Sequence, residues 1–372
     1  KERKDWTLIG KPVPRQDTPL KVNGSAKFGI DVRLPGMLYA VVERSPRFVG
    51  KVKSFDASKA LLVPGVKHVV KTERDIFGNM REGVAVVATS TWAAIKGRRA
   101  LIVEWDDTGI PEVSSASLAA ALKSSLAGKP LGFKSKGDVA AALGATPAVD
   151  VTYETPYQAH ACMEPINCTA HVTDTSAEIW GPVQAPDWNR GHLAGALKLP
   201  MEQVKVNMTF LGGGFGRKAF TDFPLEAALV SKAVKAPVQV VWTREDDLSV
   251  GPFRPGAMYH VRGALKDGKI SAIEMTMAAQ NLMAQEPGDT PKKPNDNVTE
   301  GLPETYLETI PNYQFGDIPL QAPVPVMWWR SVYSSTNGFA YESFLDEMAR
   351  AANLVSHSYG NEPRRRVRIF PG

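Results

Sequence analysis

The chain has 372 residues, of which 43% are hydrophobic and 22% are charged, and it carries a net charge of +5 at pH 7. This composition excludes a disordered chain and leaves enough apolar material for two folded domains. The positive charge is spread along the sequence except for a short basic run at residues 364–368, so it gives little support for a nucleic-acid partner.

The two cysteines, Cys162 and Cys168, are too few for a disulfide framework or for the four ligands of a zinc or iron–sulfur site. We interpret both thiols as small buried side chains. Any iron–sulfur centre that works with this chain is therefore expected on another polypeptide. No apolar run approaches the roughly 20 residues that would span a bilayer.

Residues 1–107 are predicted to form a first α/β domain. Glycine and proline turns separate three expected strands, at 36–43, 66–70 and 84–88. Thr89 or Ser90 is a suitable N-cap for a helix over 91–99, and a further strand is expected at 100–105. Residues 108–147, which contain few large apolar side chains, are predicted to be a linker with two short helices, at 117–126 and 138–143.

Residues 148–353 are predicted to form a second domain, followed by a divergent basic tail over 354–372. The expected strands are at 148–155, 168–172, 177–180, 204–210 and 238–242, with a hairpin of 258–265 and 269–277. Helices are expected at 187–199 and 222–235. Ala340, Phe344 and Met348 recur at helical spacing and predict a C-terminal helix, after a polar loop over 287–303.

A glycine-rich loop follows the strand expected at 204–210. Gly212, Gly213, Gly214 and Gly216 place four glycines in five positions, between a strand and a helix, which is typical of a backbone that a ligand approaches closely. Such a loop can bind an anion through free N–H groups. It is not a P-loop, because Arg217 separates the last glycine from Lys218 and Ala219 lies where that motif has Ser or Thr. It is not a dinucleotide fingerprint either, because Arg217 lies where that motif has its third glycine. The alternative is a tight connection without a ligand.

Three single residues outside the loop are candidates for a role at a site. Glu164 lies between Met163 and Pro165, and is either a paired structural anion or a poised group in a pocket. Arg330 precedes an expected helix start, where it could bind phosphate. We interpret His160 as a hydrogen-bonded structural imidazole.

Four segments occur together in a fixed order: residues 157–167 (YQAHACMEPIN), Gln184 in WGPVQ, the loop GGGFGRK, and WWRSV followed by FAYESFLDE at 339–347. In this combination the chain resembles the molybdenum hydroxylases of the xanthine oxidase family, in particular the large molybdopterin-binding subunit of the isoquinoline 1-oxidoreductase and membrane-bound aldehyde dehydrogenase type. The resemblance implies an α+β fold. Residues 1–107 would be the family's α/β hammerhead domain, and 148–353 the first half of its molybdopterin-binding region.

The resemblance also implies roles for individual residues. Gln184 would donate its amide toward an oxo ligand of molybdenum, and Glu164 would lie near the substrate pocket. The remaining implied cofactor-binding residues are Gly213, Gly214, Phe215, Gly216, Arg217 and Arg330.

The implied cofactor is molybdopterin with molybdenum, expected as the cytosine dinucleotide. The implied reaction is hydroxylation of an N-heterocycle or oxidation of an aldehyde, with water as oxygen donor. Electrons would pass to a small iron–sulfur subunit. The resemblance implies a periplasmic or membrane-associated location through an electron-transfer partner; the alternative is the cytoplasm, because no signal peptide opens the sequence.

One departure from the family pattern sets a second hypothesis. The family's catalytic base is a glutamate in a Gly-Glu motif, and the segment Gly360-Asn-Glu362-Pro does not match it. The chain is therefore expected to be truncated at both ends, to lack the second cofactor-binding half, and to contain no iron and little molybdenum by itself. The alternative function is a non-catalytic fragment or scaffold. The face around Gln184, Phe215 and Trp328-Trp329 is expected to pack on cofactor or on the missing half in the complete enzyme. In this chain it is expected either to self-associate or to be buried under the tail.

Overall fold

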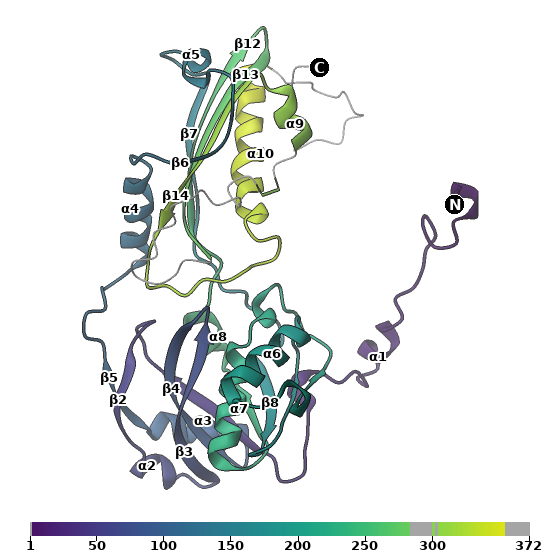
Figure 1. The fold of residues 1–372 in the computed structure, drawn as a ribbon, viewed down its shortest axis with the longest axis vertical. Coiled ribbons are helices and arrows are strands. Elements are labelled where there is room, and N and C mark those ends of the chain that lie inside the picture. The colour runs from purple at the N-terminus through teal and green to yellow at the C-terminus, as the bar shows by residue number, and fades with distance from the viewer. Residues whose placement is uncertain (1, 283–299, 302–303, 354–372) are drawn as a thin grey trace.

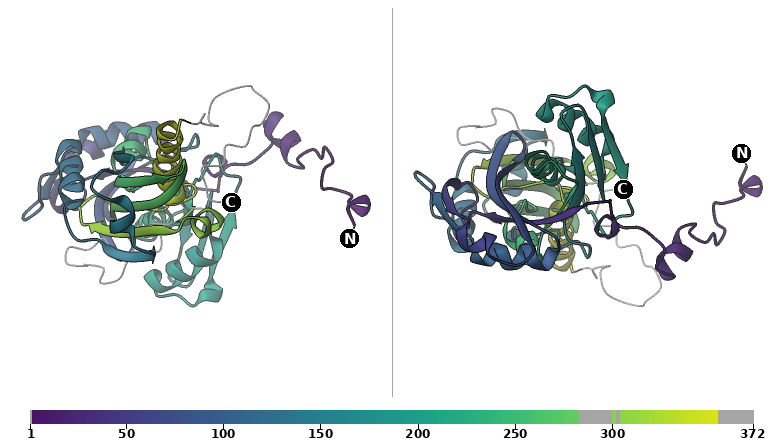
Figure 2. Two further views of the ribbon diagram at one scale, coloured as in Figure 1. Left: turned by 90° about the horizontal axis from the view of Figure 1, so that it is seen from above. Right: turned by 90° about the horizontal axis from the view of Figure 1, so that it is seen from below.

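The computed structural model describes residues 2–282, 300–301 and 304–353. The molecule has two lobes stacked along its long axis, each built on one β-sheet, and an N-terminal arm with the short helix α1 (Thr18–Val22) extends away from both (Figure 1). The arm leaves the side of the molecule in both end views (Figure 2). Among the described helices, none combines the length and the apolar character needed to cross a membrane.

The first lobe contains a seven-stranded mixed sheet in the order β10-β9-β8-β11-β1-β4-β3. Its strands are β1 (Leu38–Arg44), β3 (Val66–Ile76), β4 (Asn79–Ala88), β8 (Asn167–Val172), β9 (Ala177–Gly181), β10 (Val204–Met208) and β11 (Val238–Val241). β1 and β11 are parallel neighbours, with Leu38 opposite Val238. The sheet therefore combines strands from 1–107 with strands from 148–353, across the predicted linker.

Helices cover this sheet because its central strands are buried on both faces, as their continuous runs of Val and Ala require. The covering helices are α2 (Ser58–Leu61), α3 (Thr91–Ala100), α6 (Pro186–Leu197) and α7 (Asp222–Val234), and the short helix α8 (Arg244–Ser249) follows β11. Ser90 is the N-cap of α3, since its side chain accepts a hydrogen bond from the Ala93 N–H. A two-stranded ribbon of β2 (Lys51–Asp56) and β5 (Ile102–Asp106) lies beside the sheet.

The second lobe contains a five-stranded sheet in the order β6-β14-β13-β12-β7. Its strands are β6 (Leu131–Lys136), β7 (Val149–Thr155), β12 (Ala257–Lys266), β13 (Lys269–Gln280) and β14 (Asn312–Leu320), and its helices are α4 (Ser115–Ser125), α5 (Val139–Leu143), α9 (Glu304–Thr309) and α10 (Ser334–Ala351). α10 packs along β7 and β12 (Figure 1). Phe344 and Met348 of α10 lie directly over Gly263, where a Cβ would come within 2.5 Å of the Phe344 ring.

Several predicted elements are confirmed, including the β12–β13 hairpin and the buried stripe of Ala340, Phe344 and Met348 on α10. Others are corrected by tertiary pairing. The predicted linker contains a strand, β6, because Leu131–Lys136 pairs with β14, and neither strand was expected. Strand β9 ends at Gly181, one residue later than predicted, and Gln184 lies in the connection to α6. The tail at 354–372 and most of the loop at 287–303 lie outside the described residues.

Candidate functional site

The glycine loop, residues 212–216, follows β10 and lies against the segment that leads from β14 to α10. An added Cβ on Gly216 would lie 2.3 Å from the carbonyl oxygen of Trp328, and Gly216 has a φ of 96°. Both observations exclude a side chain at this position. The loop is therefore in contact with the main chain of the second lobe.

Three consecutive backbone N–H groups of the loop have no partner in the part of the chain that the structure describes. The amides of Gly213, Gly214 and Phe215 donate no hydrogen bond to any residue that the structure describes. Phe215 has a φ of 55°, a strained conformation for a residue with a side chain, and the residue is 41% exposed. Free amides in a turn with positive φ values can bind an anion or a polarised oxygen. The loop thus fits the anion cradle that the sequence predicts.

Gln184 completes one side of the loop. Its Oε1 accepts a hydrogen bond from the Gly216 N–H at 3.0 Å, and its own backbone N–H donates to the carbonyl of Lys218 at 2.8 Å. Because a backbone N–H can only donate, the oxygen of the carboxamide faces the loop. The NH₂ group has no partner among the described residues, and the residue is exposed. Gln184 can therefore donate to a bound ligand, as the family resemblance implies.

Glu164 is held as a paired anion behind the loop. Its carboxylate accepts a hydrogen bond from Lys218 Nζ at 2.8 Å and from the Gly212 N–H at 2.9 Å. Both side chains are almost completely buried. Of the two predicted alternatives, this geometry matches the structural anion and not a poised group in an open pocket.

Arg217 was expected to bind cofactor, but its guanidinium points into the core. It makes two hydrogen bonds of 2.8 Å to Asp222, and both residues are fully buried. Burial by itself would raise the pKa of Asp222, but the ion pairs with Arg217 and Arg74 outweigh it and lower that pKa. The Arg217 side chain is thus already neutralised by a carboxylate, which is why it does not turn toward the loop.

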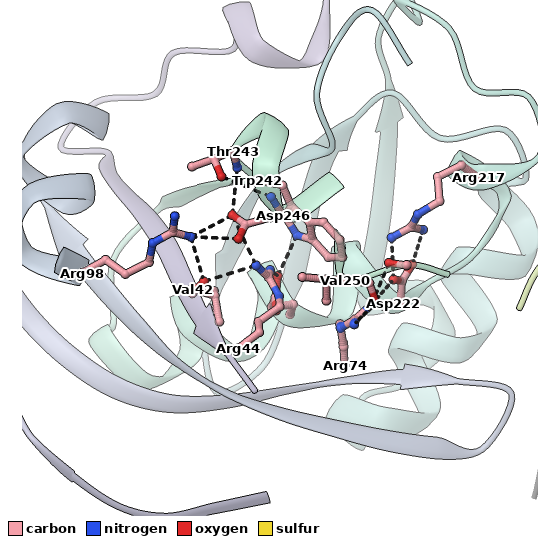
Figure 3. A network of polar contacts seen from close by, with 12 residues as sticks. Val42, Arg44, Arg74, Arg98, Arg217, Asp222, Trp242, Thr243, Asp246 and Val250 are labelled. Carbon is pink, nitrogen blue, oxygen red and sulfur yellow. Dashed lines mark hydrogen bonds and ion pairs between the residues drawn. The ribbon is translucent and has the colours of Figure 1, made fainter. Parts of the chain in front are cut away.

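The Arg217–Asp222 pair belongs to a larger group of buried charges, shown in Figure 3. We call it the charged cluster, and its members are Arg44, Arg74, Arg98, Arg217, Asp222, Glu226 and Asp246. Trp242 lies at its centre, with three arginines over its ring and its Nε1 donating to Glu226. Because Arg44, Arg74 and Arg98 come from the first 107 residues, the charged cluster joins the two halves of the seven-stranded sheet.

Arg330 precedes α10, which begins at Ser334, so its predicted place before a helix start is confirmed. It is exposed, and no hydrogen bond or ion pair joins it to another described residue. The loop contacts this segment at Trp328 and not at Arg330 itself. Arg330 therefore remains available to an anionic ligand.

Trp328, which is predicted on the face beside the loop, belongs to an aromatic group whose other members were not predicted from the sequence. Trp328 packs against Trp188 and Phe220 with ring centroids 5.5 and 5.0 Å away, and Phe77 from the β3–β4 turn packs on both Phe220 and Trp328. These residues come from four distant segments, so no local pattern could reveal the group. His160 supports it from behind by donating from Nε2 to the Trp328 carbonyl at 2.7 Å, and burial lowers the pKa of His160 to about 4. The structural role predicted for His160 matches this position.

Comparisons with known proteins agree with the sequence motifs. The family profile described as "Molybdopterin cofactor-binding domain" matches residues 127–358. The chain is 31% identical to the isoquinoline 1-oxidoreductase subunit beta of Brevundimonas diminuta, over 95% of this chain and 46% of that protein. It is 30% identical to the aldehyde oxidoreductase molybdenum-binding subunit PaoC of Escherichia coli K12, over 77% of this chain and 41% of that protein. The chain thus spans less than half the length of these two relatives.

Two solved structures share the fold. Quinoline 2-oxidoreductase from Pseudomonas putida 86 superposes with a TM-score of 0.70 at 20% identity, covering 94% of this chain and 49% of that one. The aldehyde oxidoreductase from Desulfovibrio desulfuricans gives a TM-score of 0.72 at 17% identity, covering 93% of this chain and 42% of that one. At these identities the likeness shows the fold alone.

Proposed function

The chain belongs to the molybdopterin-binding subunits of the xanthine oxidase family, and we propose that it supplies one part of the molybdenum cofactor site of an oxidoreductase. The proposed reaction is hydroxylation of an N-heterocycle or oxidation of an aldehyde, with water as the oxygen donor. When bound, the cofactor would supply the redox chemistry, while the protein binds and orients it.

The observation that carries this proposal is the combination of free donors at the loop. The amides of 213–215 and the NH₂ group of Gln184 are oriented by the protein but have no described protein partner, so they fit the oxo and phosphate oxygens of a molybdopterin cofactor. Arg330 would add a positive charge for the phosphates. The glycines at 214 and 216 let the Gln184 side chain and the Trp328 carbonyl approach the loop backbone more closely than a Cβ would allow. We propose the cytosine dinucleotide form of the cofactor.

The proposal extends to partners and location. Both cysteines are buried and unpaired, so the iron–sulfur clusters that accept the electrons are proposed on a separate small subunit. A further polypeptide segment would supply the second half of the cofactor site and the catalytic base. We propose the α/β hammerhead fold for residues 1–107. We also propose a periplasmic or membrane-associated complex, by analogy with a relative named membrane-bound aldehyde dehydrogenase. The scaffold alternative is less favoured, because the relatives named above are enzyme subunits.

The test is whether the loop retains cofactor. A Cβ on Gly214 would lie 2.4 Å from Gln184 Oε1, so Gly214→Val should displace the Gln184 carboxamide and block the cradle while the chain stays folded. The chain would be expressed in a host that makes molybdenum cofactor, and molybdenum and pterin would be measured per folded chain. We expect the unchanged chain to retain a substoichiometric amount and the variant to retain none.

Gly195 provides a matched control, because it lies on α6 and an added Cβ would have no atom within 4 Å other than those of its chain neighbours and of the α6 backbone. Gly195→Val should leave retention unchanged. Equal retention by the Gly214→Val variant and the unchanged chain would refute the placement of the cofactor at this loop. Near-stoichiometric molybdenum in the unchanged chain would refute the need for a second half.

A further inference from the structure

The loop is held from behind by a buried acid–base pair whose role the proposed function does not assign. We propose that Glu164 and Lys218 are a positioning pair, which fixes both ends of the loop in the conformation that leaves the amides of 213–215 free. This inference rests on the proposed function, because it gives the pair a role in orienting the amides that bind cofactor.

The first end of the loop is fixed at Gly212 by both the main chain and the side chain of Glu164. The Gly212 N–H donates to Glu164 Oε2, and the Glu164 N–H donates to the Gly212 carbonyl, each at 2.9 Å. An added Cβ on Gly212 would lie 2.3 Å from the Cβ of Glu164. The glycine at 212 is therefore required by Glu164, whereas those at 214 and 216 face Gln184 and Trp328.

The second end of the loop is fixed by Lys218. Its ammonium donates to Glu164 Oε2 at 2.8 Å and to the Glu164 carbonyl at 3.2 Å, and the side chain is completely shielded from solvent. The carbonyl of Lys218 in turn accepts from the backbone N–H of Gln184. The Glu164 carboxylate thus connects Gly212, at the start of the loop, with Lys218, which follows the loop. Through the carbonyl of Lys218 it is also connected to Gln184, whose NH₂ group faces the ligand.

The other oxygen of Glu164 is also occupied. Oε1 accepts from the Ile30 N–H at 3.3 Å and from Asn167 Nδ2 at 3.1 Å, so four donors surround the carboxylate. A carboxylate with these partners is not available to take a proton from a substrate. Buried ion pairs contribute little net stability compared with apolar residues of similar size, so the geometry points to control of loop conformation as the reason for this pair.

The test removes the pair without leaving a buried charge. In the variant Glu164→Leu with Lys218→Met, we expect the 372-residue chain to unfold cooperatively, since replacement of a buried pair by apolar residues is often tolerated. Hydrogen exchange would be followed in the peptide spanning 211–220, where the amides of Gly212, Gly216 and Arg217 are hydrogen-bonded. Loss of the charged acceptor should speed exchange there by about tenfold or more, and molybdenum retention should fall in parallel.

The matched control is Arg44→Met with Glu226→Leu, which removes a buried pair of 2.5 Å in the charged cluster. It should leave exchange in 211–220 unchanged. If the double substitution at positions 164 and 218 prevents folding, Glu164→Asp provides a second variant, because it keeps the charge but is too short to reach both Gly212 and Ile30. It should speed exchange at 211–220 to a smaller extent.

Unchanged exchange at 211–220 in the pair variants, or equal acceleration in the control, would overturn the positioning role. The two proposals can fail separately, because exchange is measured without cofactor. Faster exchange with unchanged molybdenum retention would refute the cofactor role of the loop and support the pair as its positioning device. Lost retention with unchanged exchange would refute the positioning role and leave the proposed function intact.

Discussion

The glycine loop and the charged cluster are joined by residues 217–222, yet the loop leaves polar groups unpaired whereas the charged cluster pairs them. In the loop, the backbone amides of 213–215 and the NH₂ group of Gln184 have no partner among the described residues. In the charged cluster, carboxylates and guanidinium groups pair with one another around Trp242 and are shielded from water. The difference shows how a few residues can present unpaired donors to a ligand: the adjacent side chains are fixed by charge pairs in the core. Variants in the two regions should therefore change different properties.

The largest effect should come from breaking one pair in the charged cluster. Glu226→Gln would remove the nearer carboxylate partner of the buried Arg44, leaving only Asp246 at 3.7 Å, and would weaken the hydrogen bond from Trp242. We expect the free energy of unfolding to fall by about 3–5 kcal/mol. Urea unfolding measures this loss, and molybdenum retained per folded chain should not change. A smaller loss, below about 1 kcal/mol, would show that the cluster is more hydrated than its burial indicates.

The second effect concerns His160 and the pH dependence of the free energy of unfolding. The pKa of His160 is about 4 in the folded chain, below its ordinary value of 6.5, because burial disfavours the charged imidazole. The unfolded chain therefore binds more protons between these values, so stability should be complete above about pH 6.5 and decrease as the pH falls toward 4, by up to about 3 kcal/mol. His160→Gln keeps a donor for the Trp328 carbonyl and should remove this part of the pH dependence. An unaltered slope in urea titrations from about pH 4 to 7 would contradict it.

A substitution at Phe215 in the glycine loop should raise the free energy of unfolding slightly. Phe215 adopts a positive φ and is partly exposed, so Phe215→Gly relieves backbone strain at the cost of chain entropy. We expect the free energy of unfolding to rise by about 0.5 kcal/mol. Phe77 has a similar φ of 52°, but its ring packs on Phe220 at 4.4 Å. Phe77→Gly should therefore destabilise the chain, and equal effects at the two positions would refute strain as the distinguishing feature of the loop.

The smallest effect on stability is expected at Arg330. Because its side chain is exposed and has no described partner, Arg330→Ala should change the free energy of unfolding by less than about 0.5 kcal/mol. It should nevertheless lower cofactor retention, and the difference from the unchanged chain should shrink at high ionic strength, because salt screens the attraction between Arg330 and the phosphates. Arg350→Ala, at the end of α10, is the control for a general loss of surface charge. If both substitutions lower retention equally, Arg330 has no specific contact with cofactor.

The sequence predicted those parts of the site that a continuous segment forms better than those that depend on contacts between residues far apart in the sequence. Four glycines in five positions predict the loop, and the family resemblance implies that Gln184 faces the same cofactor; in the structure Gln184 contacts the loop at Gly216. The orientation of the Arg217 side chain could not be predicted, because it depends on contacts with Asp222 and Trp242. These contacts form only when α7 and β11 pack together in the folded chain. The role of Lys218 was missed for the same reason. Its carboxylate partner lies 54 positions away, and nothing in a single sequence marks that pair.

The fold shows the same contrast between local and distant determinants. Hairpins and amphipathic helices were predicted from periodicity and turn residues. Strand β6 was not, because Leu131–Lys136 contains glycine and lysine and has strand structure only through its pairing with β14. Likewise, the sequence indicates where β1 and β11 begin, but not that they are neighbours.

The pairing of β1 with β11 has a consequence for how the chain reaches its structure. Leu38 cannot find Val238 until most of the polypeptide has been synthesised, so the strands of the first 107 residues present an unpaired edge during that time. Contacts between positions so far apart in sequence slow folding. We expect refolding of the whole chain to be slow, and a polypeptide ending near residue 107 to aggregate instead of forming a stable domain.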